Sequence, residues 1–197
     1  MKYALFGDSH AQVVFPILER KLNEQGHDVV ISKPVAGWTL KKHLENDFES
    51  LLMDSDADVL LLSLGGNNAD LSPSYGDTVN KALSIAKRAG IKTIYWVSPA
   101  SSTRSDVQTR HEWTSNWLKT NLPKKVRFID IRSITKDGHR SDGVHFTNQK
   151  YAEWAELVSD HLLTKNAITQ IPTWTWWASG SMIVLSLIAV GLKRWKN

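Results

Sequence analysis

The chain contains no cysteine, and that absence removes several kinds of chemistry at once. Disulfide bonds, thiolate metal sites and a cysteine nucleophile are excluded, while the redox compartment stays open. A strong excess of charge is also absent, because 24 Lys and Arg residues stand against 20 Asp and Glu residues and leave a net charge of +4. No segment interleaves aromatic residues with a basic stripe. The sequence therefore gives no support for a nucleic-acid partner.

Charged side chains are missing from residues 167–192 near the C-terminus. Within this segment, residues 174–192 have the sequence WTWWASGSMIVLSLIAVGL, and a membrane helix needs about 20 mainly apolar residues. Three tryptophans begin the run and basic residues follow it in 193–197, as expected where a span is anchored at both interfaces. We therefore expect a linker at 166–173, a transmembrane helix at 174–192 and a basic tail at 193–197.

The alternatives to membrane insertion are a buried core helix and a helix that contacts a second subunit. The lack of any polar face favours the membrane. The side of the membrane on which the domain at 1–165 lies stays open. The basic tail predicts a cytoplasmic C-terminus and an exported domain, whereas residues 1–8 lack the pattern of a signal peptide and favour a tail anchor with the domain in the cytoplasm.

Short apolar runs alternate with segments of helical spacing throughout residues 1–165, which we expect to form one domain. The apolar run at 58–64 is typical of a central parallel strand that is buried on both faces. The alternation predicts an α/β fold, a three-layer α/β/α sandwich with a five-stranded parallel sheet. Strands are expected at 3–6, 28–31, 58–64, 92–97 and 126–131, and helices at 13–25, 39–53, 75–89, 105–121 and 147–163, where Thr147 is positioned to cap the last helix.

Polar motifs follow four of the expected strands. Gly7-Asp8-Ser9 follows the first strand, Gly37 the second, Gly65-Gly66-Asn67 the third, and the segment from Asp142 to His145 the fifth. Each motif alone is weak, since short matches arise by chance and Gly and Asn are common in turns. Because the carboxyl ends of parallel strands lie at one edge of a sheet, the four motifs are expected to meet there.

These residue types together suit nucleophilic catalysis. A serine hydroxyl is a poor nucleophile until a base removes its proton, and histidine can accept and return that proton near neutral pH. An aspartate holds the imidazole in the correct tautomer and stabilises the imidazolium. Fixed amide donors stabilise the oxyanion of a tetrahedral intermediate. Ser9, His145 and Asp142 are the candidates for the first three roles.

With these motifs the chain resembles the SGNH hydrolases, also called the GDSL esterase/lipase family, over about residues 1–163. The resemblance implies a flavodoxin-like α/β/α sandwich. It implies that Ser9 is the nucleophile, His145 the general base and Asp142 its orienting partner. It also implies an oxyanion hole made of the backbone N–H groups of Ser9 and Gly37 and the side-chain amide of Asn67. The family hydrolyses esters of sugars and lipids as well as thioesters, and the mechanism requires no metal or organic cofactor.

Two positions depart from the family pattern. His10 stands where the family usually has leucine, and we expect it to be an ordinary residue at a helix N-terminus rather than a pocket group. Asn68 stands where aspartate is frequent. The remaining histidines lack a metal-ligand pattern and are expected to be solvated, whereas three tryptophans are expected in the core or lining a groove. The histidines are His43, His111, His139 and His161, and the tryptophans are Trp113, Trp117 and Trp154.

The sequence thus predicts a serine esterase or acylhydrolase, anchored to a membrane by its C-terminus, that cleaves an O-acyl group from a glycan or lipid. One rival is a non-catalytic structural or binding protein at a membrane, including a viral component, that retains the fold. A second rival is a nucleotide or flavin binder, which the lack of a phosphate-cradling glycine series disfavours. The acyl group, the alcohol and the oligomeric state stay open.

Overall fold

Five parallel strands form one sheet in the computed structural model, which describes residues 1–68 and 74–167. The spatial order is β2-β1-β3-β4-β5, so β1 and β3 lie at the centre. All pairs are parallel, and Leu5 of β1 is in register with Leu61 of β3. The strands are β1 Lys2–Gly7, β2 Asp28–Pro34, β3 Val59–Ser63, β4 Thr93–Val97 and β5 Val126–Ile129.

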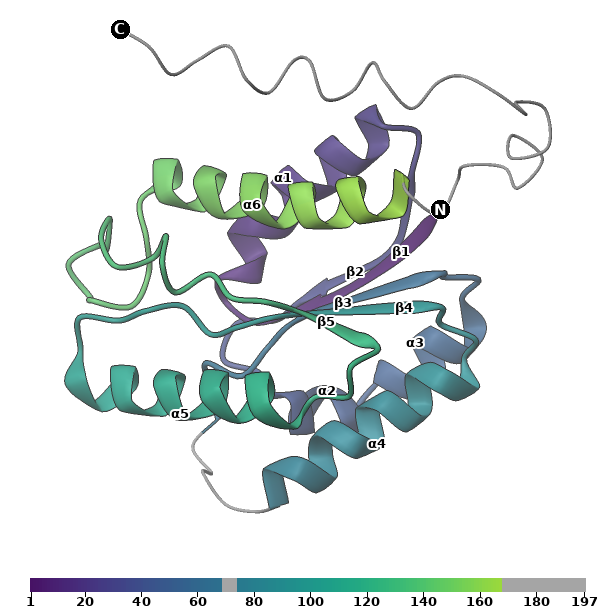
Figure 1. Ribbon diagram of the computed structural model, residues 1–197, viewed down its shortest axis with the longest axis horizontal. Coiled ribbons are helices and arrows are strands. Elements are labelled where there is room, and N and C mark those ends of the chain that lie inside the picture. The colour runs from purple at the N-terminus through teal and green to yellow at the C-terminus, as the bar shows by residue number, and fades with distance from the viewer. Residues whose placement is uncertain (69–73, 168–197) are drawn as a thin grey trace, which may run out of the picture. The chain divides into compact units, whose positions relative to one another are not determined.

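Helices cover both faces of the sheet (Figure 1). Helices α1 and α6 lie on one face, and α2, α3, α4 and α5 lie on the other (Figure 1). This arrangement confirms the predicted three-layer α/β/α architecture and its parallel sheet. The helices are α1 Ala11–Glu24, α2 Leu40–Glu45, α3 Phe48–Asp54, α4 Ser74–Arg88, α5 Ser105–Asn121 and α6 Asn148–Ala167.

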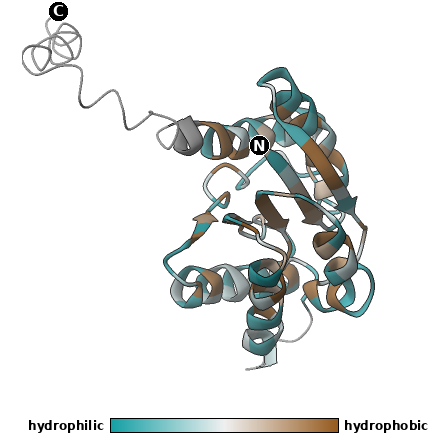
Figure 2. Ribbon diagram, turned by 90° about the vertical axis from the view of Figure 1, so that its right-hand side faces the viewer, coloured by the Kyte–Doolittle hydropathy of each residue, from teal (hydrophilic) through white to brown (hydrophobic). Residues whose placement is uncertain are grey.

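The core forms where the central strands are covered from both sides. Every residue of β3 is buried, as is every residue of β1 after Lys2, and the central strands are hydrophobic along their length (Figure 2). Such strands need no alternation of polar and apolar residues, because neither face meets water. The buried Trp96 of β4 adds a hydrogen bond from Nε1 to the carbonyl oxygen of Leu64 at 3.1 Å. This bond fixes the start of the loop that leaves β3.

The helix predicted at 39–53 is in fact two helices, α2 and α3. Thr39 begins α2, since its Oγ1 accepts a hydrogen bond from the N–H of Lys42 at 3.1 Å. The side chain of Asn46 donates to the carbonyl oxygen of Lys42 at 2.7 Å, and the carboxylate of Asp47 pairs with Lys33 of β2. Asn and Asp compete with the helical backbone for hydrogen bonds, so the pair ends α2 despite the continuous helical spacing.

Other boundaries differ from the prediction by a few residues. Strand β5 ends at Ile129 rather than at 131, because the Asp130 carboxylate accepts hydrogen bonds from the backbone and side chain of Arg132 and closes a turn. Strand β2 continues to Pro34. The predicted cap is confirmed, since Oγ1 of Thr147 accepts the N–H of Lys150 at 3.4 Å at the start of α6.

Residues 1–162 form one compact unit. Within the described residues, no helix combines the length and apolar character needed to cross a bilayer. The first two residues of the predicted linker belong to α6. The rest of that linker, the predicted transmembrane helix at 174–192 and the basic tail at 193–197 lie outside the described residues, so these assignments stay predictions.

Candidate active site

Ser9 lies in the short turn between β1 and α1. The turn is tight, since the N–H of Gln12 donates to the carbonyl oxygen of Asp8 at 3.3 Å and the N–H of His10 donates to the Asp8 carboxylate at 3.1 Å. Helix α1 packs closely on the end of the strand, because a Cβ atom on Gly7 would lie 2.1 Å from Cβ of Ala11. Glycine at position 7 therefore lets the strand turn directly into the helix and carries the half-buried Ser9 at the sheet's edge.

The segment from Asp142 to His145 is a turn held by its own carboxylate. Oδ1 of Asp142 accepts the N–H groups of Val144 and His145, both at 2.9 Å, and Oδ2 accepts Nδ1–H of His145 at 2.8 Å. Gly143 has φ +70°, a left-handed conformation that glycine adopts without strain. The Val144 N–H first, and then His145, hold the pKa of the Asp142 carboxyl well below its usual range. A carboxylate at Nδ1 keeps the proton there and leaves Nε2 free to accept.

The Nε2 atom of His145 lies 3.0 Å from Oγ of Ser9. The structure thus joins Ser9, His145 and Asp142 by two hydrogen bonds, although 133 residues separate Ser9 from Asp142 in the sequence. Both distances are within the reach that proton transfer to a general base requires.

Besides Ser9, the residues assigned to an oxyanion hole are Gly37 and Asn67, which lie in the loops after β2 and β3. Gly37 has φ +73°, and a Cβ atom there would meet nothing within 4 Å, so the backbone conformation rather than a close approach calls for glycine. The side-chain amide of Asn67 donates to the carbonyl oxygen of Trp38 at 3.2 Å. An amide nitrogen carries two hydrogens, so this bond leaves one for another acceptor. The convergence of the Ser9, Gly37 and Asn67 donors on one oxygen stays a prediction.

Hydrogen bonds also tie the loop after β4 to the turn that carries His145. The Ser102 hydroxyl and the Thr103 N–H both donate to the carbonyl oxygen of Gly143, at 2.7 and 2.9 Å. The ring of His139 contacts the carbonyl oxygen of Ser101 through Nε2 at 3.0 Å. The exposed turn is therefore braced from the neighbouring loop as well as by its own carboxylate.

His10 and Asp8 are buried beside Ser9, which the sequence pattern did not predict. The His10 ring lies 5.1 Å from the ring of His145, and its Nδ1 is 3.0 Å from the hydroxyl of Tyr151. Burial first, and then the charge of His145, lower the pKa of His10 to about 3. Burial raises the pKa of Asp8 to about 6. His10 does precede α1 as expected, but it is also a neutral wall against which the His145 ring packs.

Two histidines that were expected to be solvated are buried. His43 is fully covered and contacts the carbonyl oxygen of Gly7 through Nε2 at 3.1 Å, and His111 is 3 % exposed. Helical spacing could have revealed both. His43 shares a face of α2 with Leu40, and His111 lies on the buried stripe of α5 between Val107 and Leu118. The three tryptophans are core residues or pack against the core, as predicted.

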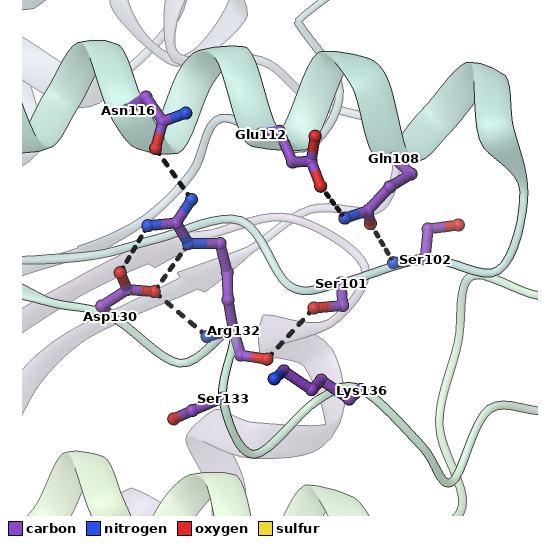
Figure 3. A pocket seen from close by; sticks show the side chains of 9 residues that line it. All are labelled: Ser101, Ser102, Gln108, Glu112, Asn116, Asp130, Arg132, Ser133 and Lys136. Carbon is purple, nitrogen blue, oxygen red and sulfur yellow. Dashed lines mark hydrogen bonds and ion pairs between the residues drawn. The ribbon is translucent and has the colours of Figure 1, made fainter.

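A polar groove of about 770 Å³ lies between α5 and the loop after β5 (Figure 3). At its centre the Arg132 guanidinium donates to Asp130 at 2.8 Å and to Asn116 at 2.9 Å. Two cationic and two anionic side chains line the groove, so its charges balance. Its wall includes Ser102, which donates to the turn that carries His145. The lining residues are Ser101, Ser102, Gln108, Glu112, Asn116, Asp130, Arg132, Ser133 and Lys136.

No family model and no curated protein matches this chain. Solved structures do match. A structure of TesA has a TM-score of 0.66 at 16% identity and covers 83% of this chain and 99% of its own. A Clostridium thermocellum family 3 carbohydrate esterase has a TM-score of 0.64 at 17% identity, covering 85% of this chain and 98% of its own. A lipase/acylhydrolase from Enterococcus faecalis has a TM-score of 0.61 at 16% identity, covering 83% and 96%. At these identities the likeness establishes the fold, which is that of the SGNH hydrolases.

Proposed function

We propose that this protein is a serine ester hydrolase in which Ser9, His145 and Asp142 form the catalytic triad. The observation that carries the proposal is the pair of hydrogen bonds from Ser9 Oγ to His145 Nε2, at 3.0 Å, and from His145 Nδ1 to Asp142, at 2.8 Å. A fold alone hosts many functions, so this geometry, and not the likeness to other structures, supports an ester hydrolase.

In the first half of the reaction, Ser9 Oγ attacks the ester carbonyl carbon while its proton passes to Nε2 of His145. Asp142 stabilises the imidazolium that forms. The N–H groups of Ser9 and Gly37 and the amide of Asn67 are proposed to hold the oxyanion, and each such donor is worth about 3 kcal/mol. The tetrahedral intermediate then collapses, and the alcohol leaves with the proton from Nε2.

In the second half, a water molecule attacks the acyl group on Ser9 and gives its proton to Nε2. A second tetrahedral intermediate collapses, the carboxylic acid leaves, and the proton returns to Ser9 Oγ. In each half one carbon–oxygen bond forms and another breaks, and no atom is oxidised or reduced. The side chains and water therefore account for every bond and every proton.

For the substrate we propose an O-acyl group on a glycan or a lipid. The structural neighbours include a carbohydrate esterase and a lipase/acylhydrolase, so they do not separate the two classes. The groove beside α5 adjoins the turn that carries His145 through Ser102, and we propose that it would suit an alcohol rich in hydroxyl groups, because its polar side chains can exchange their mutual hydrogen bonds for bonds to hydroxyls. The proposed anchor at 174–192 would bring the site close to membrane lipids or envelope glycans.

A fluorophosphonate probe tests the nucleophile directly. It should label the wild-type protein and Ser84→Ala, whose exposed serine lies on α4, but not Ser9→Ala. A panel of p-nitrophenyl esters and acetylated glycans, run on the same three proteins, should then show Ser9-dependent hydrolysis and rank the acyl groups. Absence of Ser9-dependent labelling and hydrolysis would favour the non-catalytic membrane protein.

The membrane anchor has its own test. The full chain should float with lipid vesicles on a density gradient, and Leu185→Arg combined with Ile188→Arg should abolish flotation, since each arginine costs about 3 kcal/mol at the centre of a span. Flotation that survives both arginines would refute the anchor. Protease protection of the folded unit in intact cells would then identify the side of the membrane.

A further inference from the structure

His111 connects two of the loops that surround the proposed active site. It lies on α5 and is 3 % exposed. Its Nδ1 is 2.7 Å from the carbonyl oxygen of Ala100 in the loop after β4, and its Nε2 is 3.1 Å from the carbonyl oxygen of Gly66 in the loop after β3. A buried ring that contacts two separate loops fixes their spacing.

Gly66 packs closely between His111 and Asp8, which lies in the turn that carries Ser9. A Cβ atom on Gly66 would lie 3.2 Å from Nε2 of His111 and 3.5 Å from Oδ2 of Asp8. The next residue is Asn67, whose side chain donates to the carbonyl oxygen of Trp38 at 3.2 Å. The loop after β3 is thus held by His111 on one side and by the loop after β2 on the other, with Asn67 between them.

Each of the two contacts of His111 requires a proton on the ring nitrogen concerned, because a carbonyl oxygen only accepts. The imidazolium makes both bonds, and a neutral ring makes one at a time. Burial lowers the pKa of His111, and the carbonyl groups of Ala100 and Gly66 act in the opposite direction. The contact that matters for Asn67 is the one from Nε2 to Gly66.

We propose that His111 is a positioning residue that sets the place of the Asn67 amide in the oxyanion hole, and that it does so in the tautomer whose ring proton is on Nε2 and is donated to the Gly66 carbonyl. The proposal rests on the proposed ester hydrolysis for its effect on rate. The ring nitrogens of His111 contact the carbonyl oxygens of Ala100 and Gly66, so it would act through the backbone of residues 66–67.

Replacing His111 by asparagine or by glutamine distinguishes the effects of its two ring contacts. Asparagine at 111 places a donor near the position of Nδ1 and keeps the bond to Ala100 alone, whereas glutamine reaches about as far as Nε2 and keeps the bond to Gly66. We expect kcat to fall about 10²-fold in His111→Asn, because misplacement by about 1 Å has that cost, with KM little changed. His111→Gln should recover most of the loss. His161→Asn, the same replacement of a ring that contacts a backbone carbonyl of its own helix through Nδ1, is the control.

A double-mutant cycle shows whether the effect passes through Asn67. In the Asn67→Ala background, His111→Asn should cost less than about twofold, since contacting residues in one network are not additive. An undiminished loss in that background, or an unchanged kcat in His111→Asn alone, would overturn the proposal. If His111→Asn does not fold, Gly66→Ala tests the same contact, because the added Cβ atom would lie 3.2 Å from Nε2 of His111. The same loss of kcat and the same non-additivity with Asn67→Ala are expected there.

A second readout does not depend on activity. The side-chain amide resonances of Asn67 in NMR spectra should move in His111→Asn and stay near their wild-type positions in His111→Gln. Unmoved resonances in His111→Asn refute the positioning role even in an active enzyme. A wild type with no Ser9-dependent hydrolysis refutes the proposed function instead, and the resonances still decide whether His111 positions Asn67.

Discussion

The two segments that meet at the Ser9–His145 hydrogen bond are built in opposite ways. Residues 7–10 are packed between the sheet and α1, and Asp8 is 4 % exposed. Residues 142–145 form a surface turn in which the side chain of Asp142 is 49 % exposed. The pKa values of the two aspartates are shifted in opposite directions. Burial raises the pKa of Asp8 to about 6, and hydrogen bonds from Val144 and His145 lower the pKa of Asp142.

The difference shows two ways of holding a reactive side chain still. Tertiary packing fixes Ser9, and it also buries a carboxyl group whose ionisation opposes folding. Local hydrogen bonds fix His145, and they involve little burial. Changes at Gly7 and Asp8 are therefore expected to act on stability, and changes at Asp142 on turnover.

The largest effect is expected for Asp142→Asn. The new amide can still accept the N–H groups of Val144 and His145 through its oxygen, so the turn survives. It presents N–H instead of an acceptor to Nδ1 of His145, which favours the wrong tautomer and removes the charge opposite the imidazolium. We expect kcat to fall by about 10³- to 10⁴-fold, as in other triads, with little change in the free energy of unfolding.

Steady-state kinetics and urea unfolding of the same samples check this expectation. Asp106→Asn, an exposed aspartate paired with Arg104 at the start of α5, is the control for loss of a surface carboxylate. A kcat within tenfold of wild type in Asp142→Asn would remove Asp142 from the triad. A large loss of stability would show that the turn is not held independently of the packed core.

An intermediate effect, measured on stability, is expected for Gly7→Ala. Its Cβ atom would lie 2.1 Å from Cβ of Ala11 and 2.9 Å from Cζ of Phe15, so α1 must move away from β1. Overpacking of this kind costs about 3 kcal/mol or more where the contacting atom is held by the backbone. The urea midpoint should fall accordingly. Adding Ala11→Gly removes the shorter contact and should restore part of the loss; no restoration would place the strain elsewhere.

The sequence carries more information about where the candidate site residues lie than about what surrounds them. Parallel strands bring their carboxyl ends to one edge, so the order of Gly7-Asp8-Ser9, Gly37, Gly65-Gly66-Asn67 and the turn at Asp142 was enough to predict one shared rim. The hydrogen bonds among Ser9, His145 and Asp142 follow from that topology. The contacts between loops depend on side-chain packing, which leaves no periodic pattern in the sequence.

The buried histidines show where the prediction stopped. His10 is covered by Tyr151 and Trp154 of α6, so its burial depends on tertiary contacts, whereas helical spacing could have revealed the burial of His43 and His111. The break between α2 and α3 likewise depends on Asp47 reaching Lys33 of β2. The opposite pKa shifts of Asp8 and Asp142 have the same origin, because two residues of one type are distinguished only by their surroundings.

The smallest effect is expected for Asp8→Asn, and its sign depends on pH. The pKa of Asp8 is raised from 3.8 to about 6 in the folded chain, so the protonated carboxyl favours folding. Its contribution to stability is complete below about pH 4, is lost as the pH rises to about 6, and changes no further above that. This increase in pKa corresponds to a loss of about 3 kcal/mol of stability when Asp8 is ionised. In Asp8→Asn that loss is absent, but an unpaired amide hydrogen costs about 1 kcal/mol.

Asparagine is neutral at every pH and its oxygen can still accept the N–H of His10, so the variant should be about 2 kcal/mol more stable than wild type at pH 7.5 and no more stable at pH 4. Urea unfolding at the two pH values measures both differences. The exposed Asp54→Asn at the end of α3 is the control, with no gain at either pH. An equal effect of Asp8→Asn at pH 4 and pH 7.5 would show that the charge of Asp8 does not oppose folding. The contrast with Asp142 would then be one of exposure alone.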